Sequence, residues 1–264
     1  MTNGHYSKRS AQPSNPQKVS YLIKRGMNSR QYSPGIAQKL IETYSLLGGE
    51  VLIHELKDPA SGLSHLAGAI MSVIGLVVLL RAGIANDDPW QIVSFAIFGG
   101  SLILLYSASA TYHLLSVPPR VEVVLRKLDH IMIFVLIAGT YTPVCLGPLR
   151  GTMGYAILII IWALAIAGVF FKIFRLDAPR WLYTGIYLVM GWLIVLATVP
   201  LARAVGLDRL FWLVIGGVFY SIGAVIYGLK KPDPFPGRFG FHEIFHIFIL
   251  LGSLSHFRFI YLLA

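Results

Sequence analysis

The sequence predicts an all-α, polytopic membrane protein with seven transmembrane helices, and three observations support that prediction. Of its 264 residues, 56% are hydrophobic and only 13% are charged, whereas about a quarter are charged in an ordinary soluble domain. The apolar residues gather in seven segments, each close to the ~20 residues that a helix needs to cross a bilayer. The lysines and arginines are spread unevenly between the connecting loops, which orients the segments.

The chain divides into a basic tail, residues 1–56, and a transmembrane domain, residues 57–264. We expect the tail to be cytoplasmic and largely disordered, because residues 1–34 are rich in Ser, Asn, Gln, Pro and basic side chains. Residues 36–56 mix apolar and charged side chains, which allows a short amphipathic helix on the membrane surface. The pair Gly48-Gly49 interrupts that pattern and favours a structured linker instead.

The expected spans of the transmembrane domain differ in how cleanly they match a membrane helix. The fourth is the cleanest, since it contains the uninterrupted apolar run from Ile157 to Trp162. The second and third contain polar residues, and Pro143 should kink or end the third helix. The expected spans cover residues 63–83, 91–115, 128–147, 152–173, 181–201, 210–229 and 241–263.

Loop charges determine the expected orientation of the spans. The first loop has Asp87 and Asp88 but no base, the third has only Arg150, and the fifth has Arg203 and Arg209. The second, fourth and sixth loops are richer in bases, which are Arg120, Arg126, Lys127, Lys172, Arg175, Arg180, Lys230, Lys231 and Arg238. Because cytoplasmic loops carry the excess of Lys and Arg, we predict a cytoplasmic N-terminus and an outside C-terminus, in the plasma (inner) membrane.

The net charge of +10 has two interpretations, a membrane surface or a nucleic acid. In a membrane protein, a basic tail marks topology and attracts an anionic leaflet. A nucleic-acid partner is the weaker interpretation, because the bases are not interleaved with aromatic residues and no binding motif is present. We therefore expect membrane lipids as partners and no nucleic acid. The single Cys145 cannot form an internal disulfide.

Two histidines at the start of the last span, His242 and His246, are the strongest functional signal in the chain. Four residues apart, they share one face of a helix, and ionisable groups inside a membrane mark functional sites. The predicted orientation places His113 and Asp129 at the same cytoplasmic level, with Ser109 one turn deeper than His113. Three imidazoles with an open fourth position suit zinc, which lowers the pKa of a bound water to about 7. Asp129 could orient or deprotonate that water, and Ser109 could hydrogen-bond a ligand ring or help hold an oxyanion.

Ordinary structural roles remain open for the same residues. The three histidines could be polar contacts between helices, or could face water at the interface. Asp129 stands at a helix start, where the macrodipole favours acids, and Ser109 could bond the carbonyl four residues back. The occurrence of three histidines and an aspartate at one level favours the zinc site. For His65 and Asp58 we expect contacts at the cytoplasmic rim.

Over about residues 55–264 several motifs match one known family. The matching stretches are Asp58-Pro59-Ala60-Ser61 with Ser64-His65, Ser109-Ala110-Thr111-Tyr112-His113, Leu128-Asp129-His130, Ile137-Ala138-Gly139-Thr140-Tyr141-Thr142-Pro143 and His242-Glu243-Ile244-Phe245-His246. Through them the chain resembles the hemolysin III family, bacterial members of the progestin and adipoQ receptor group, which has seven transmembrane helices. It departs from the family pattern at the first motif, where Asp58 replaces the usual Glu and Ser61 the usual Asn.

The resemblance also bears on function. It implies zinc bound by His113, His242 and His246, with Asp129 contacting the metal's water and Ser109 beside it. The wider superfamily includes ceramidase-like lipid hydrolases, so the first hypothesis is an intramembrane zinc-dependent hydrolase of lipid amides or esters. The second is a non-enzymatic receptor or regulator of membrane lipid state with structural zinc. The third, a cytolysin, follows from the family name, but a soluble toxin must reach its target through water and this chain is too apolar.

Overall fold

The computed structural model describes residues 56–175, 178–235 and 239–264. The predicted disordered tail and linker therefore lie outside the described residues, apart from Leu56. The described residues are helical, with turns and one isolated β-bridge between Phe235 and Phe239. The helices are α3 (Pro59–Ala85), α4 (Pro89–Leu114), α5 (Pro119–Leu146), α6 (Thr152–Phe174), α7 (Arg180–Trp192), the 3-10 helix η1 (Leu193–Ala197), α8 (Thr198–Val205), α9 (Leu207–Leu229) and α10 (Phe241–Tyr261).

Six helical segments among the described residues are long and apolar enough to cross a membrane. They are α3, α4, α6, α9, α10 and the segment Arg180–Val205, which joins α7, η1 and α8. Each overlaps one predicted span. The remaining helix, α5, begins at Pro119, well ahead of the predicted start at residue 128, and its first turns carry Arg120, Glu122, Arg126, Lys127 and Asp129. These charges make α5 less apolar than the other six segments.

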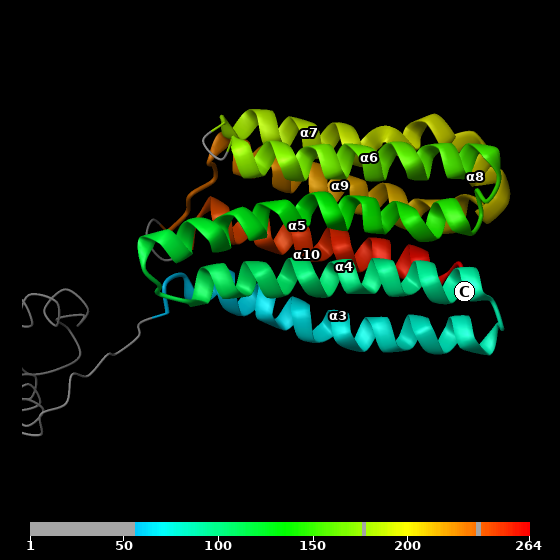
Figure 1. The fold of residues 1–264 in the computed structure, drawn as a ribbon, viewed down its shortest axis with the longest axis horizontal. Coiled ribbons are helices and arrows are strands. Elements are labelled where there is room, and N and C mark those ends of the chain that lie inside the picture. The colour runs from blue at the N-terminus through cyan, green and yellow to red at the C-terminus, as the bar shows by residue number, and fades with distance from the viewer. Residues whose placement is uncertain (1–55, 176–177, 236–238) are drawn as a thin grey trace, which may run out of the picture. The chain divides into compact units, whose positions relative to one another are not determined.

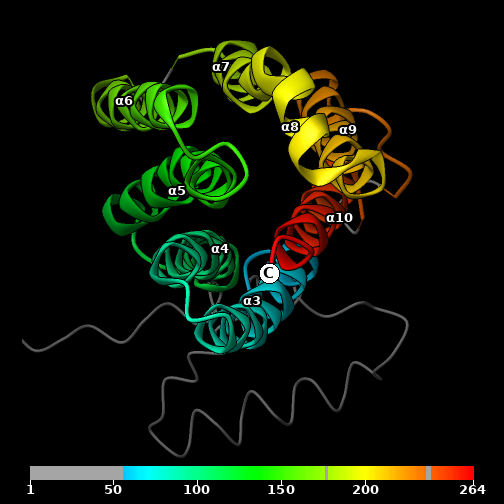
Figure 2. The same ribbon diagram turned by 90° about the vertical axis from the view of Figure 1, so that its right-hand side faces the viewer.

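The helices form an open ring when viewed along their axes (Figure 2). Going round the ring, α3 packs on α4, α4 on α5, and α5 on α6 and α7; α7 packs on α9, α9 on α10, and α10 on α3. Figure 1 shows that the helices run side by side, so that α3 and α10 begin at the end where α4 finishes. Three chain segments that are far apart in sequence therefore meet at that end.

The outer surface of the helices is apolar, as expected for a protein surrounded by lipid. On α6, Ile159 is 69% exposed, whereas Gly168 lies so close to α5 that an added Cβ would collide with the ring of Phe134. Small residues at helix contacts are typical of membrane proteins. Several hydroxyl side chains are buried instead, among them Ser101 and Thr142. Ser101 lies against Gly139 of α5 and Thr142 accepts a hydrogen bond from Trp162 of α6, so these polar groups are shielded between neighbouring helices.

Proline starts three of the helices, at Pro59, Pro89 and Pro119, because a first-turn residue needs no N–H for the helix. Before α4, Asp88 caps the helix by accepting hydrogen bonds from two N–H groups of its first turn, at 2.9 and 3.4 Å. Asp58 occupies the equivalent position before α3, yet it forms no side-chain cap. Its carboxylate is therefore available for another partner.

The fifth expected span, residues 181–201, is not one continuous α-helix, because η1 interrupts it between α7 and α8. Tyr141 of α5 lies against this interruption. Its hydroxyl accepts a hydrogen bond from the N–H of Ile194 at 2.8 Å and lies 2.8 Å from the carbonyl oxygens of Met190 and Gly191. Backbone groups released from an α-helix inside a membrane need such partners, so Tyr141 stabilises the break.

Candidate metal centre

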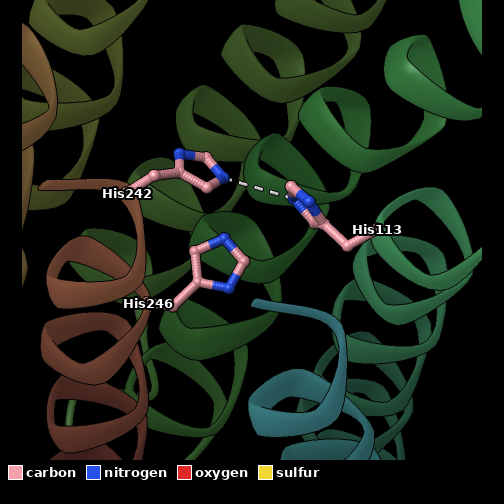
Figure 3. A group of neighbouring side chains, drawn as sticks. All are labelled: His113, His242 and His246. Carbon is pink, nitrogen blue, oxygen red and sulfur yellow. Dashed lines mark hydrogen bonds between the residues drawn. The ribbon is translucent and has the colours of Figure 1, made fainter. Parts of the chain in front are cut away.

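Three histidines from two helices converge at one end of the ring. His113 lies next to the last residue of α4, and His242 and His246 lie in the first two turns of α10. One nitrogen of each ring lies within 4.8 Å of the other two, and Figure 3 shows the three side chains gathered around a common space. This group could hold a metal ion, so the predicted meeting of the three side chains is confirmed.

A carboxylate orients the ring of His113. Its Nδ1 lies 3.1 Å from Oδ2 of Asp58, and the N–H of Asp58 donates to the backbone carbonyl of His113 at 2.8 Å. A carboxylate oxygen accepts hydrogen bonds, so this contact favours the tautomer with the proton on Nδ1 and the lone pair on Nε2. That Nε2 lies 3.3 Å from Nε2 of His242. The rim residue Asp58 is thus a direct partner of a candidate metal ligand.

A backbone carbonyl orients His246 in the same way. Its Nδ1 lies 3.3 Å from the carbonyl oxygen of Ser61 on α3. A carbonyl oxygen is also only an acceptor, so this contact favours the proton on Nδ1 and leaves the lone pair on Nε2. Carboxylate and carbonyl partners of this kind usually accompany histidines that bind metals, because they fix the ring and its tautomer.

Glu243 lies between the two histidines of α10 and fixes the start of that helix. Its carboxylate accepts a hydrogen bond from the N–H of Gly240 at 2.7 Å and another from Oγ of Ser61 at 3.1 Å. The first contact is the glutamate half of a capping box, and the second joins α10 to α3. Ser61 therefore positions both His246 and the helix that carries it.

His65, for which the sequence predicts a contact at the cytoplasmic rim rather than metal binding, is buried against the three-histidine group and is not part of it. It is only 4% exposed, and its ring stacks on that of His246, with centroids 3.7 Å apart and an interplanar angle of 14°. Among the described residues neither of its nitrogens has a hydrogen-bond partner. The sequence did contain a signal, because Asp58 and His65 are seven residues apart and so share one helix face.

The two residues predicted to be catalytic lie on the wall of a shared cavity. Asp129 and Ser109 line the same cavity as His242 and His246, but they are not part of the three-histidine group. Oδ2 of Asp129 lies 3.6 Å from Nδ1 of its neighbour His130, and Ser109 is buried on α4. The structure therefore brings both residues near the site, and their catalytic roles stay predictions.

That cavity has a volume of about 570 Å³ and extends from the histidines into the ring of helices. Its lining runs from His242 to His256 along α10, a distance of about 20 Å at the rise of an α-helix. The wall is mainly apolar, and ionisable side chains gather at the histidine end. An apolar cavity with polar groups at one end is the usual form of a small-molecule site.

Comparisons with known proteins find relatives that span the helical region. The model of a family described as haemolysin-III related matches residues 53–257. The chain is 41% identical over 201 residues to a hemolysin-3 homolog of Bacillus subtilis (strain 168), covering 76% of this chain and 91% of that protein. It is 39% identical over 201 residues to hemolysin-3 of Bacillus cereus, covering 76% and 89%. The human monocyte to macrophage differentiation factor is 25% identical over 202 residues, covering 74% and 79%.

Proposed function

Because the chain belongs to the haemolysin-III related family, we propose that this multi-pass membrane protein is a zinc-dependent hydrolase of lipid amides or esters. One observation carries the proposal: three imidazole nitrogens converge beside a long apolar cavity. At this end of the cavity, a metal ion that activates water would lie next to the acyl chain of a lipid bound in the apolar cavity. The membrane itself would supply the substrate.

The donor set fits zinc. Zinc prefers nitrogen and sulfur ligands, whereas magnesium and calcium prefer oxygen. In a tetrahedron with Zn–N bonds of ~2.0–2.1 Å, two nitrogens lie about 3.3 Å apart, and the Nε2 atoms of His113 and His242 are 3.3 Å apart. Three protein ligands leave one position open, which is typical of catalytic sites. A bound zinc ion would supply a Lewis acid that acidifies water to a pKa of about 7.

The protein's own residues would perform the remaining steps. Asp129 would take the proton of the attacking water and return it to the leaving amine or alkoxide as the C–N or C–O bond breaks, because it is the carboxylate on the wall of the same cavity. Ser109 would donate its hydroxyl hydrogen to the oxyanion that develops at the scissile carbonyl. Asp58 and the carbonyl of Ser61 would keep the rings of His113 and His246 in the tautomer whose Nε2 faces the site.

Turnover by purified, zinc-loaded protein tests this function. A long-chain N-acyl sphingosine and an acyl glycerol ester are the probes, and release of fatty acid is the readout. We expect Asp129→Asn to lower the rate by about a hundredfold or more, as for other general bases, and Asp88→Asn at the other end of α4 to leave it unchanged. The proposal is wrong if neither probe is turned over, or if Asp129→Asn retains the wild-type rate.

One observation favours a second candidate, a non-enzymatic receptor or regulator of membrane lipid state with structural zinc. Asp129 lies outside the three-histidine group, and the partner nearest its carboxylate is His130. In that case zinc would hold α4 to α10 without activating water. Metal removal would then lower the melting temperature, and the zinc-loaded protein would turn over no lipid.

Lysis of red cells by low doses of purified protein would instead support a cytolysin, the function suggested by the name of the Bacillus cereus relative.

The proposal includes seven spans, with α5 as the third, a cytoplasmic N-terminus and an outside C-terminus in the plasma membrane. Support for α5 comes from its position in the ring between α4 and α6. Its charges lie in its first turns, where they could remain at the membrane surface. A reporter that is active only outside the membrane, fused after Ala264, should be active; activity of a reporter that works only in the cytoplasm would contradict this orientation.

A further inference from the structure

The cavity wall carries more positively charged than negatively charged side chains. The cavity is lined by three cationic side chains, Arg126 of α5, Lys172 of α6 and Arg180 of α7, and by one carboxylate, Asp129. These four residues come from three helices that meet at the histidine end of the ring. Among the described residues, no ion pair involves either arginine. A positive field therefore remains at this end of an otherwise apolar cavity.

The cationic residues share neighbours on the cavity wall. His130 interacts electrostatically with Arg126, Lys172 and Asp129, and Tyr227 does so with Arg126, Arg180 and Asp129. The guanidinium of Arg180 lies 5.2 Å from the ring centroid of Tyr227. We define Arg126, Lys172 and Arg180 as the cationic cluster.

The cationic cluster adjoins the metal centre. The ring of Tyr227 lies 6.0 Å, centroid to centroid, from that of His242, so one aromatic side chain separates Arg180 from a candidate metal ligand. Tyr227 also lines the cavity. A ligand whose anionic group is bound by the cationic cluster would therefore have a neighbouring part of the same molecule close to the three histidines.

Membrane topology alone does not explain Lys172. Basic residues that orient a span need to face the aqueous cytoplasm, and Arg126 and Arg180 are exposed. Lys172 is only 2% exposed, and its ammonium lies 3.6 Å from the ring centroid of Tyr183 inside the protein. Lys172 also lines the cavity, so its ammonium is placed to meet an anion bound there.

We propose that the cationic cluster binds the phosphate head group of an anionic acyl lipid, whose chain occupies the cavity. Arginine and lysine are the side chains that proteins use for phosphate, through charge-assisted hydrogen bonds. The cavity accepts an acyl chain along about 20 Å of α10, and its apolar wall excludes water. The combination selects a lipid that is both apolar and anionic over a neutral lipid with the same chain.

Binding of an anionic lipid to the cationic cluster does not require that the protein hydrolyses lipids. That the bound lipid is also the substrate rests on the proposed function. Binding is therefore measured on metal-free protein, in which no turnover occurs. If binding is found and no lipid is hydrolysed, the proposed hydrolase fails and the lipid site stands. If neutral lipids are hydrolysed and no preference for phosphate is found, the lipid site fails and the hydrolase stands.

The experiment is calorimetric titration of full-length, metal-free protein in detergent with oleoyl lysophosphatidate and with mono-oleoylglycerol. The two probes differ only in the phosphate. We expect lysophosphatidate to bind about tenfold or more tightly, as for one charge-assisted contact. Lys172→Met and Arg180→Gln should each remove most of that preference; Arg180 is exposed, so its variant tests the site even if loss of the buried Lys172 disturbs folding.

Arg120→Gln is the matched control, because Arg120 lies in the first turn of α5 at the same end of the ring but does not line the cavity. This variant should keep the wild-type preference. Equal affinity for the two probes would overturn the proposal, as would the same loss of preference in Arg120→Gln and Arg180→Gln. Inorganic phosphate is the third probe: affinity equal to that of lysophosphatidate would assign the cluster to free phosphate and overturn the lipid site.

Discussion

Asp58 provides the sharpest test of how the metal centre is supported. Its Oδ2 lies 3.1 Å from Nδ1 of His113, so Asp58→Ala removes the acceptor that fixes the ring and its tautomer. Outer partners of metal-binding histidines are worth about 10- to 100-fold in metal affinity. Because the side chain of Asp58 is 46% exposed, water weakens the contact. We therefore expect the lower end of that range, about tenfold, or about 1.4 kcal/mol.

The assay is competition for zinc between the purified variant and a fluorescent chelator of known affinity. Asp88→Ala is the matched control, because Asp88 also precedes the first proline of a helix but lies at the other end of α4. Loss of its cap should lower stability by about 1 kcal/mol and leave zinc affinity unchanged. An Asp58→Ala variant that binds zinc as tightly as wild type, or an equal loss in Asp88→Ala, would refute the assigned role of Asp58.

Two further predictions concern the packing around the centre and the broken span. Tyr141→Phe leaves the part-buried N–H of Ile194 without its partner, so thermal unfolding should show a loss of about 1–3 kcal/mol; the exposed Tyr155→Phe should show none, and an equal effect of the two would contradict this. His65→Phe keeps a ring stacked on His246 and should retain zinc, whereas His65→Ala should bind it several-fold more weakly; chelator competition that finds both variants equal would contradict a positioning role for the stack.

Features that depend on local sequence were predictable. The lengths of the apolar runs located the helices, because a span needs a nearly constant number of apolar residues. The i, i+4 spacing of His242 and His246 placed both rings on one face of α10, because helix geometry is regular. The meeting with His113 required one further step, the loop charges, which predicted that α4 ends where α10 begins. Figure 1 shows the two helix ends at the same end of the molecule, and the Nε2 atoms of His113 and His242 lie 3.3 Å apart there.

Features that depend on contacts between distant segments were not predictable from local patterns. The break at η1 is stabilised by Tyr141, which is 53 residues before Ile194 in sequence. Pro200 is a local signal of a disturbed helix, because it leaves the carbonyl of Leu196 in η1 without its helical donor, but it does not reveal the contact with Tyr141. The burial of His65 follows from the packing of α3 against α10, which a single helix does not reveal. The start of α5 was misjudged because its first turns are charged, and the prediction counted only its apolar part.

The cavity and its cationic cluster depend on the arrangement of all the helices. Lys172 counted only as a topology signal in the sequence, because its position relative to the other helices was unknown. In the folded ring the same residue is buried on the wall of a cavity. The charge pattern therefore predicted which end of the molecule would be basic, but not that the bases would line an internal site.

The central claim is that His113, His242 and His246 hold one metal ion, and elemental analysis of detergent-purified protein tests it most directly. We predict about one zinc per chain in wild type and none in His113→Ala or His242→Ala. His130→Ala is the control, since His130 lies outside the three-histidine group, and it should retain the metal. Full zinc content in both His113→Ala and His242→Ala would contradict the claim, as would a wild-type protein that binds no metal.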